Sequence, residues 1–425
     1  MKVKVFLITA LAALGCLAAQ IPPPYEVATW KDFKSAAISY TFDDGCTNQF
    51  QIAIPAFDQY GFKLTLFPVI NWNPNWSKLK AAADSGHEVA SHTVSHANLS
   101  GLSAGEQTTE LENSRKSIES NINGYKCLTT AYPYCAKGTD NITSKYYIAA
   151  RGCQGFIEGS TPGSYMNVSS IVCGDLGSVK TLADFTSRFQ TTLNQKGWCT
   201  FLIHGIDGDG GYSPLSSDTL KASLQYLDQN RDKFWVTSFM NAARYAKERD
   251  CLTIEEISSS DSLITLQVRD TLPDSLYDAP VTLRRPLPAG WTTVRVEQDN
   301  QSCSATIVEV NAQQFVVFDA VPDGGTVRIV NEALASVNNA SIKNSMGDYK
   351  VKLTRSILSL SGPAFAKGKL FAVVYNLKGS LVWTGEISAV DGTMAVKLPR
   401  ALSGGMYTVM LSSGEQILRE NLLVY

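Results

Sequence analysis

Two adjacent aspartates and three histidines are the residues of this sequence whose types and spacing best fit hydrolytic metal chemistry. Asp43 and Asp44 directly follow a short apolar stretch, and His92 and His96 lie further along the chain with three residues between them. A divalent ion such as zinc is commonly held by His and Asp side chains with a position left open for water. The chain has only four histidines, and His204 ends another apolar stretch. The pattern predicts a metal site formed by Asp44, His92 and His96.

The two other members of this set have the chemistry of a base and an acid. Zinc lowers the pKa of bound water from 15.7 to about 7 in the best-known case. Asp43 would accept the proton as general base, and His204 would protonate the leaving group. Each piece alone has a plainer interpretation: a turn for the aspartates and a surface or structural position for the histidines. Their joint occurrence in a histidine-poor chain favours the site, whereas we interpret His87 as structural.

The elements that would position these residues alternate along the first half of the chain. From about Trp30 to Arg249 short apolar runs alternate with helical stretches, which predicts a parallel sheet or barrel with crossover helices. Ser103 and Glu106 form a capping box before a helix. Strands are expected at residues 36–42, 64–69 and 200–204, and the helix after Ser103 has Leu111, Ile118 and Ile122 on its inner side.

After Cys251 the pattern changes to short alternating strands separated by turn residues. This indicates an antiparallel sandwich to about Glu332, a polar linker at 336–341 and a second strand-rich segment. Both β-modules lack histidine, so we assign the chemistry to the first domain. The last module resembles secretion-sorting or adhesion modules, and a carbohydrate-binding module is the alternative for either. The predicted segments are a signal peptide at 1–19, a catalytic domain at 20–250, and β-sandwich modules at 251–335 and 336–425.

The first residues have the pattern of a secretory signal peptide. Lys2 and Lys4 precede an apolar run that is too short to span a bilayer, and small residues follow it. A buried N-terminal helix would need a polar face, which this run lacks. Cleavage after Ala19 predicts a secreted protein, whereas lipidation of Cys16 would place the protein at the cell surface. We expect no transmembrane segment.

Charge and cysteine content narrow the partners and the compartment. The net charge of −2 provides no basic surface for nucleic acid, so an uncharged polymer is the expected partner. Nine cysteines leave eight after Cys16, an even set that favours disulfides in an oxidising compartment. No C-x-x-C pair is found, which argues against zinc binding by thiolates. The sequence fixes neither the disulfide connectivity nor the oligomeric state.

Four segments together resemble a known family. They are Thr41-Phe42-Asp43-Asp44-Gly45, His92-Thr93-Val94-Ser95-His96, Tyr132-Pro133-Tyr134 and Leu202-Ile203-His204. They are similar to successive motifs of the polysaccharide deacetylase family, also called the NodB homology domain or carbohydrate esterase family four. The resemblance extends from the signal peptide to about residue 250. It implies a distorted (β/α) barrel that removes acetyl groups from polysaccharide or oligosaccharide.

The resemblance also implies residue roles. Asp43 is the expected base and His204 the acid, while Asp44, His92 and His96 hold one divalent ion, with zinc favoured over cobalt or manganese. Leu202 would form the pocket for the acetate methyl group. The backbone N–H of Tyr134 would stabilise the oxyanion.

Two departures from the family pattern concern the surroundings of the base and of the acid. The third motif usually opens with an arginine, but here this position is Ala131. We predict that Arg151 supplies the guanidinium, the alternative being a surface or packing arginine. The fourth motif, an aspartate pair before tryptophan, is missing, and Asp175 is the candidate partner of His204.

Residues around the motifs could bind sugar. The glycine-rich segment 205–212 could contact sugar through Asp207 and Tyr212 or bind calcium. Its spacing of calcium ligands is incomplete, which favours a plain loop. Trp72 and Trp76 are expected to be exposed stacking platforms, and Trp198 to lie in the core. Acetyl esters of xylan are the favoured substrate, with chitin oligomers, peptidoglycan glycan or an inactive carbohydrate-binding protein as alternatives.

Overall fold

The computed structural model describes most of the chain. The described residues are 22, 24–332, 350–361, 369–376, 380–390, 393–398, 401–413 and 416–424. The expected signal peptide and the expected linker at 336–341 lie outside these ranges. Contacts group the chain into one unit of residues 1–259, 264–288 and 296–329 and a second unit of 260–263, 289–295 and 330–425. We describe each unit by itself.

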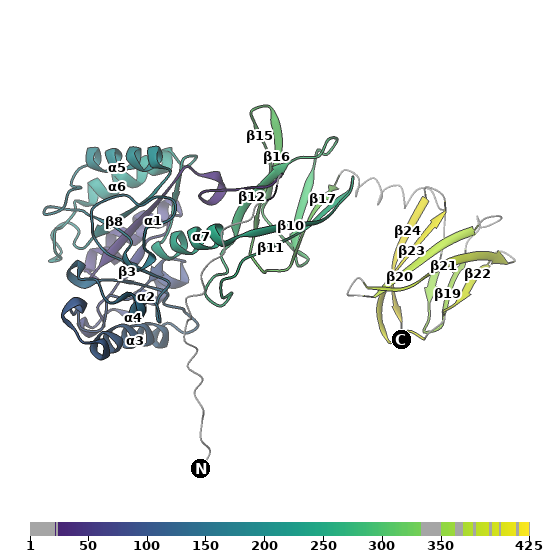
Figure 1. The fold of residues 1–425 in the computed structure, drawn as a ribbon, viewed down its shortest axis with the longest axis horizontal. Coiled ribbons are helices and arrows are strands. Elements are labelled where there is room, and N and C mark those ends of the chain that lie inside the picture. The colour runs from purple at the N-terminus through teal and green to yellow at the C-terminus, as the bar shows by residue number, and fades with distance from the viewer. Residues whose placement is uncertain are drawn as a thin grey trace, which may run out of the picture. The chain divides into compact units, whose positions relative to one another are not determined.

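A parallel sheet forms the centre of the first unit (Figure 1). Its strand order is β4-β3-β2-β8-β7, and β9 also pairs with β2. Every residue of β2 is buried, as expected for a parallel strand covered on both faces. The bounds are β2 (Ala36–Asp43), β3 (Thr65–Phe67), β4 (Glu88–Val89), β7 (Ile171–Val172), β8 (Trp198–Ile203) and β9 (Phe234–Val236).

Two further parallel strands extend this sheet towards a barrel. β5 (Thr129–Ala131) pairs with β6 (Ala149–Arg151). Single bridges continue the pairing, from Ser91 beyond β4 to Thr130 and from Arg151 to Val168 before β7. The distorted α/β barrel expected from the sequence is confirmed.

The crossover helices follow the expected pattern. The predicted capping box is present at the start of α3, where Ser103 and Glu106 cap each other. The side chains of Leu111, Ile118 and Ile122 are buried in the core. No helix of the described residues is long and apolar enough to cross a membrane. The bounds are α1 (Ile54–Tyr60), α2 (Trp76–Asp84), α3 (Ala104–Asn121), α4 (Asp140–Thr143), α5 (Leu182–Gln195), α6 (Ser217–Gln229) and α7 (Phe239–Cys251).

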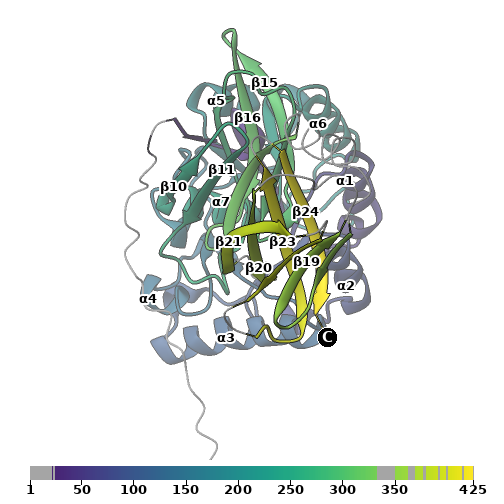
Figure 2. The ribbon, with the colours of Figure 1, turned by 90° about the vertical axis from the view of Figure 1, so that its right-hand side faces the viewer.

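Two antiparallel sheets follow the barrel, and the all-β character predicted for this region is confirmed. One has the order β1-β12-β16-β15, the other β10-β11-β17-β13-β14. β15 and β16 form a hairpin that projects beyond the neighbouring strands (Figure 1, Figure 2). The bounds are β1 (Glu26–Val27), β10 (Thr253–Ser259), β11 (Leu263–Arg269), β12 (Val281–Pro286), β13 (Val294–Gln298), β14 (Gln301–Ser302), β15 (Ala305–Val310), β16 (Gln313–Ala320) and β17 (Thr326–Asn331).

The strand β1 precedes the barrel in sequence but pairs with the downstream module. Glu26 and Val27 lie opposite Arg284 and Leu283 of β12. Further contacts within the first unit connect barrel and module, among them the backbone N–H of Ala279, which donates to Glu248 of α7. The predicted boundary after residue 250 is therefore crossed by the N-terminal segment.

The C-terminal region is again all β, as expected. Seven strands follow the order β18-β19-β22-β21-β20-β23-β24, and each neighbouring pair is antiparallel. Their buried side chains, including Leu358, Val374 and Val409, form a separate core. The bounds are β18 (Lys350–Leu353), β19 (Ile357–Ser361), β20 (Lys369–Asn376), β21 (Leu381–Val390), β22 (Thr393–Lys397), β23 (Gly405–Ser413) and β24 (Gln416–Val424).

Candidate active site

The carboxyl ends of the parallel strands bring the predicted residues together. Asp43 is the last residue of β2, and His204 directly follows β8. Asp44 turns sharply away from the strand with φ 75°. His92 and His96 lie in the loop after β4, and His96 has φ 59°. Left-handed backbone is costly for residues with a side chain, so the surrounding contacts must hold these turns.

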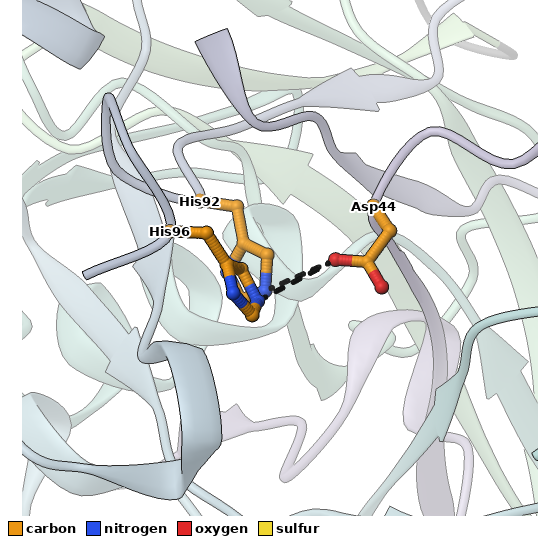
Figure 3. A group of neighbouring side chains, drawn as sticks. All are labelled: Asp44, His92 and His96. Carbon is orange, nitrogen blue, oxygen red and sulfur yellow. Dashed lines mark ion pairs between the residues drawn. The ribbon is translucent and has the colours of Figure 1, made fainter. Parts of the chain in front are cut away.

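Asp44, His92 and His96 form a compact cluster (Figure 3). Oδ1 of Asp44 lies 3.7 Å from Nε2 of His92 and 3.6 Å from Nε2 of His96. The other ring nitrogen of His92, Nδ1, lies 2.9 Å from the carbonyl oxygen of Ala131, to which it can donate. That bond leaves the lone pair of Nε2 directed at Asp44, the arrangement typical of a metal-ligating histidine.

The electrostatics of this cluster fit a cation. Burial, together with the charge of Asp43, raises the pKa of Asp44 to about 7. Burial lowers the pKa of His92 to about 4, and it also lowers the pKa of His96, so both rings are neutral donors near pH 7. Among the described residues Oδ1 of Asp44 has no hydrogen-bond partner. A buried carboxylate oxygen without a donor, next to two neutral imidazoles, is the donor set that a divalent ion needs.

Asp43 is held in its charged form by Arg151. Nη2 of Arg151 donates to Oδ2 of Asp43 at 2.5 Å, and both side chains are almost fully buried. Burial alone would raise the pKa of Asp43, but the charge and hydrogen bond of Arg151, with contributions from His92 and His204, outweigh it, and the pKa is lowered. The strand register explains the position of the guanidinium, because Arg151 of β6 pairs with Ala131 of β5. The arginine absent from position 131 is replaced from the adjacent strand.

His204 also lies beside Asp43. Its Nε2 is 3.9 Å from Oδ2 of Asp43. Burial lowers the pKa of His204, and the charge of Asp43 opposes this effect. Nδ1 of His204 has no hydrogen-bond partner within the described ranges. Asp175, the candidate for that role, is exposed.

A cavity of about 460 Å³ opens over these groups. Leu202 and Tyr134 are among the residues that line it. Contact of Leu202 with the acetyl methyl group and donation by the Tyr134 backbone to the oxyanion stay predictions. Tyr134 is 69% exposed, has φ 56°, and its ring lies 4.6 Å from that of His96. The Tyr212 ring meets His204 edge-on at 5.0 Å.

Two residues without a signal in the sequence position the predicted site residues. Glu110 of α3 accepts hydrogen bonds from the backbone N–H groups of Val94 and Ser95, and so fixes the loop between the two histidines. Gln49 donates through Nε2 to the carbonyl oxygens of both Asp43 and His204. No sequence signal distinguished them from a solvated helix residue and an ordinary polar residue.

The segment after His204 is a structured loop. Oδ1 of Asp209 accepts from the N–H groups of Ile206 and Gly211. The side chain of Asp207 accepts from the N–H of Ser217 and thereby caps the N-terminus of α6. Tyr212 is the member of the loop that faces the cavity.

The tryptophans and His87 divide between surface and core. Trp72 is 52% exposed and its ring lies 4.9 Å from His96, whereas Trp76 is half-buried. Trp198 is fully buried, as expected. His87 accepts through Nδ1 from the N–H of Leu64 and lies outside the cavity.

A disulfide connects two loops of the site. Cys135 follows Tyr134 and is bonded to Cys153, two residues after Arg151. The broader expectation of disulfides among the cysteines is met here, whereas Cys46, Cys127, Cys173, Cys199 and Cys303 are free thiols.

Comparison with known proteins finds a family match for the first part of the barrel. Residues 31–149 match the sequence model of the polysaccharide deacetylase family. A gellan lyase of a Bacillus species is 30% identical over 334 residues, which are 74% of this chain and 13% of that protein. YxkH of Bacillus subtilis strain 168, whose name includes polysaccharide deacetylase, is 35% identical over 81 residues, 18% of this chain and 29% of that protein.

One similar solved structure is the Xyl-CE4 domain of a multidomain xylanase from the hindgut metagenome of Trinervitermes trinervoides. It has 20% sequence identity and a TM-score of 0.36, and the match covers 49% of this chain and 89% of that domain. The matched segments span less than a third of each curated relative. Residues 31–149 therefore match the polysaccharide deacetylase family, and this segment includes Asp43, Asp44, His92 and His96.

Proposed function

We propose that this chain is a secreted, metal-dependent hydrolase that removes acetyl groups from carbohydrate, with O-acetyl esters of xylan as the favoured substrate. One observation carries the proposal. The carboxylate of Asp43 is held charged by Arg151 and lies within 4 Å of both His92 and His204, beside a donor set suited to a divalent ion. Base, acid and ion site thus surround one cavity.

Asp44, His92 and His96 would hold the ion, for which we favour zinc over cobalt or manganese. Such an ion lowers the pKa of water and polarises an acyl oxygen. Asp43 would accept a proton from the attacking water, and His204 would donate a proton to the leaving sugar oxygen. The products are acetate and the free sugar hydroxyl.

The remaining residues would orient the acyl group. The backbone N–H of Tyr134 is our candidate for the donor to the oxyanion, and Leu202 would contact the acetyl methyl group. Arg151 would act as a positioning residue, since its guanidinium donates to Asp43.

The test is the substitution Asp43→Asn. It keeps the size of the side chain but removes the base, so kcat for acetate release should fall by roughly 10³-fold. Metal content, measured on the same preparation, should stay at the wild-type level because Asp43 is not a ligand in the proposal. Equal acetate release by wild type and variant would exclude Asp43 as the base.

The substrate preference needs a separate measurement. The metal-loaded enzyme should release acetate from acetyl-xylan and none from chitin oligomers or peptidoglycan glycan. The reverse result would make the chain an N-deacetylase. Glycan binding without any turnover, in zinc, cobalt or manganese, would favour the alternative of a carbohydrate-binding protein.

A further inference from the structure

A second cavity adjoins the proposed acyl site. It has a volume of about 170 Å³ and meets the first cavity at Asp44. Its lining includes Trp72, Asn73 and Asn75 from the segment between β3 and α2, Lys78 from the first turn of α2, and Phe50 from the segment after β2. The lining therefore includes two aromatic rings, two amides and one ammonium group, which is a composition suited to a sugar ring with a polar substituent.

Trp72 makes this cavity continuous with the catalytic groups. Its ring lies against His96, with 4.9 Å between ring centroids, and half of the side chain is exposed. A sugar unit that packs on this ring would be the neighbour of the unit whose acetyl group reaches Asp43. Aromatic rings commonly supply such an apolar platform beside polar groups.

Lys78 gives the cavity its charge. Its Nζ lies 5.7 Å from the centroid of the Phe50 ring. None of the described carboxylates is within ion-pair distance of this ammonium group, whereas Lys80 on the same helix is paired with Asp84. Lys78 is also in the first turn of α2, where the helix dipole adds positive potential. Asp44, the one acidic group of the lining, belongs to the proposed ion site.

We propose that this second cavity binds an acidic sugar unit whose carboxylate pairs with Lys78, so that the preferred polysaccharide carries a uronic acid next to the acetylated sugar. The inference rests on the proposed deacetylase function and narrows its substrate class.

The test uses two matched acetylated oligosaccharides. One carries a uronic acid beside the acetylated unit, and in the other that carboxyl group has been reduced to an alcohol. We expect wild type to have a roughly three- to tenfold higher kcat/KM for the acidic form at low salt, a preference that salt weakens. The ratio should fall to about one in Lys78→Gln, because the variant lacks the charge that attracts the carboxylate. It should fall below one in Lys78→Glu, which repels the carboxylate; the preference is small because the pair is exposed. Lys80→Gln, the matched control on α2, should keep the wild-type ratio.

The possible results separate the two proposals. An equal ratio in wild type and Lys78→Gln, or a wild-type preference for the reduced form, would overturn the acidic subsite while leaving the deacetylase intact. If wild type released acetate from neither compound, the proposed function would fail instead. Calorimetric binding of the deacetylated acidic oligosaccharide to wild type and Lys78→Gln would then decide the subsite: weaker binding by the variant supports it, and equal binding refutes it.

Discussion

Two carboxylates of the first unit, Asp43 at the site and Glu248 in α7, are similarly buried, but their pKa values are shifted in opposite directions. Each has one oxygen with a donor and one without a partner among the described residues. Arg151 pairs with Asp43, and the pKa of Asp43 is lowered. Burial raises the pKa of Glu248 to about 8, because it receives only the N–H of Ala279 and a weak field from Arg244.

The difference lies in where each guanidinium is directed. Arg151 donates to Asp43 itself, whereas Arg244 pairs with Asp278. A charge that makes no hydrogen bond to a buried carboxylate does not offset the free-energy cost of burying it, but a hydrogen-bonded charge does. The guanidinium thus keeps Asp43 charged despite its burial, whereas burial favours the protonated form of Glu248.

Arg151→Met should have the largest effect on this contrast. Without the guanidinium, burial would raise the pKa of Asp43 as it does that of Glu248, and the base would become protonated. We expect kcat for acetate release to fall by about 100-fold. Arg151→Lys should restore part of it, and Arg269→Met, at an exposed pair with Glu255, should change nothing. Activity within threefold of wild type in a folded Arg151→Met protein would contradict the role.

Removal of the Cys135–Cys153 disulfide tests whether the Arg151 strand end must be held in place. The double substitution to serine should lower kcat by roughly threefold to tenfold through looser positioning. The unfolding free energy should fall by about 3 kcal/mol, the value expected for a loop of similar length. Denaturant unfolding and acetate release measure the two effects, with Cys303→Ser as the control at a free thiol. Full activity of the double variant would show that β-sheet pairing alone positions Arg151.

Glu248→Gln should abolish the pH dependence of the unfolding free energy that Glu248 causes. The folded-state pKa of Glu248, about 8, lies above its ordinary value. The folded state therefore binds this proton more firmly than the unfolded state, and the stabilisation is lost as pH rises from about 4 to 8. The variant should exceed wild type by roughly 1–2 kcal/mol in unfolding free energy at pH 8 and lose this advantage near pH 4. A constant difference across that range would contradict the shift, and Glu255→Gln is the exposed control.

Asp278→Asn should have the smallest effect. Asp278 is more than half exposed, and its neutralisation would release Arg244 towards Glu248. The pKa of Glu248 should fall, so the loss of unfolding free energy between pH 5 and pH 8 should shrink by less than about 1 kcal/mol. Denaturant titrations at both pH values measure this change. An unaltered or steeper pH dependence would show that Arg244 does not reach Glu248; Asp84→Asn, in the exposed pair with Lys80, is the matched control.

Much of the barrel and of its chemistry could be predicted from local pattern. β2 and α3 have apolar runs and a capping box, which are signals contained within a few residues. Asp44, His92 and His96 were recognisable because histidine is rare in this chain. Arg151 could be proposed because the usual position holds Ala131, but its contact with Asp43 depends on the register of β5 and β6.

Contacts between distant residues could not be predicted in this way. Gln49 reaches the carbonyl of His204 across 155 positions, and Glu110 looks like any acidic residue on an exposed helix face. The pairing of Cys135 with Cys153 is one among many that eight cysteines allow. These contacts depend on the tertiary fold, and no periodicity in one sequence encodes them.

The two-residue strand β1 has a consequence for how such proteins can be recombined. Because Glu26 and Val27 occupy one edge of β12 while β16 occupies the other, the downstream sheet is completed by residues encoded ahead of the barrel. A gene fusion or truncation made after Cys251 would leave that strand without its partner. An exchange of the module between proteins would have to include both flanks of the barrel, so the two are expected to be inherited together.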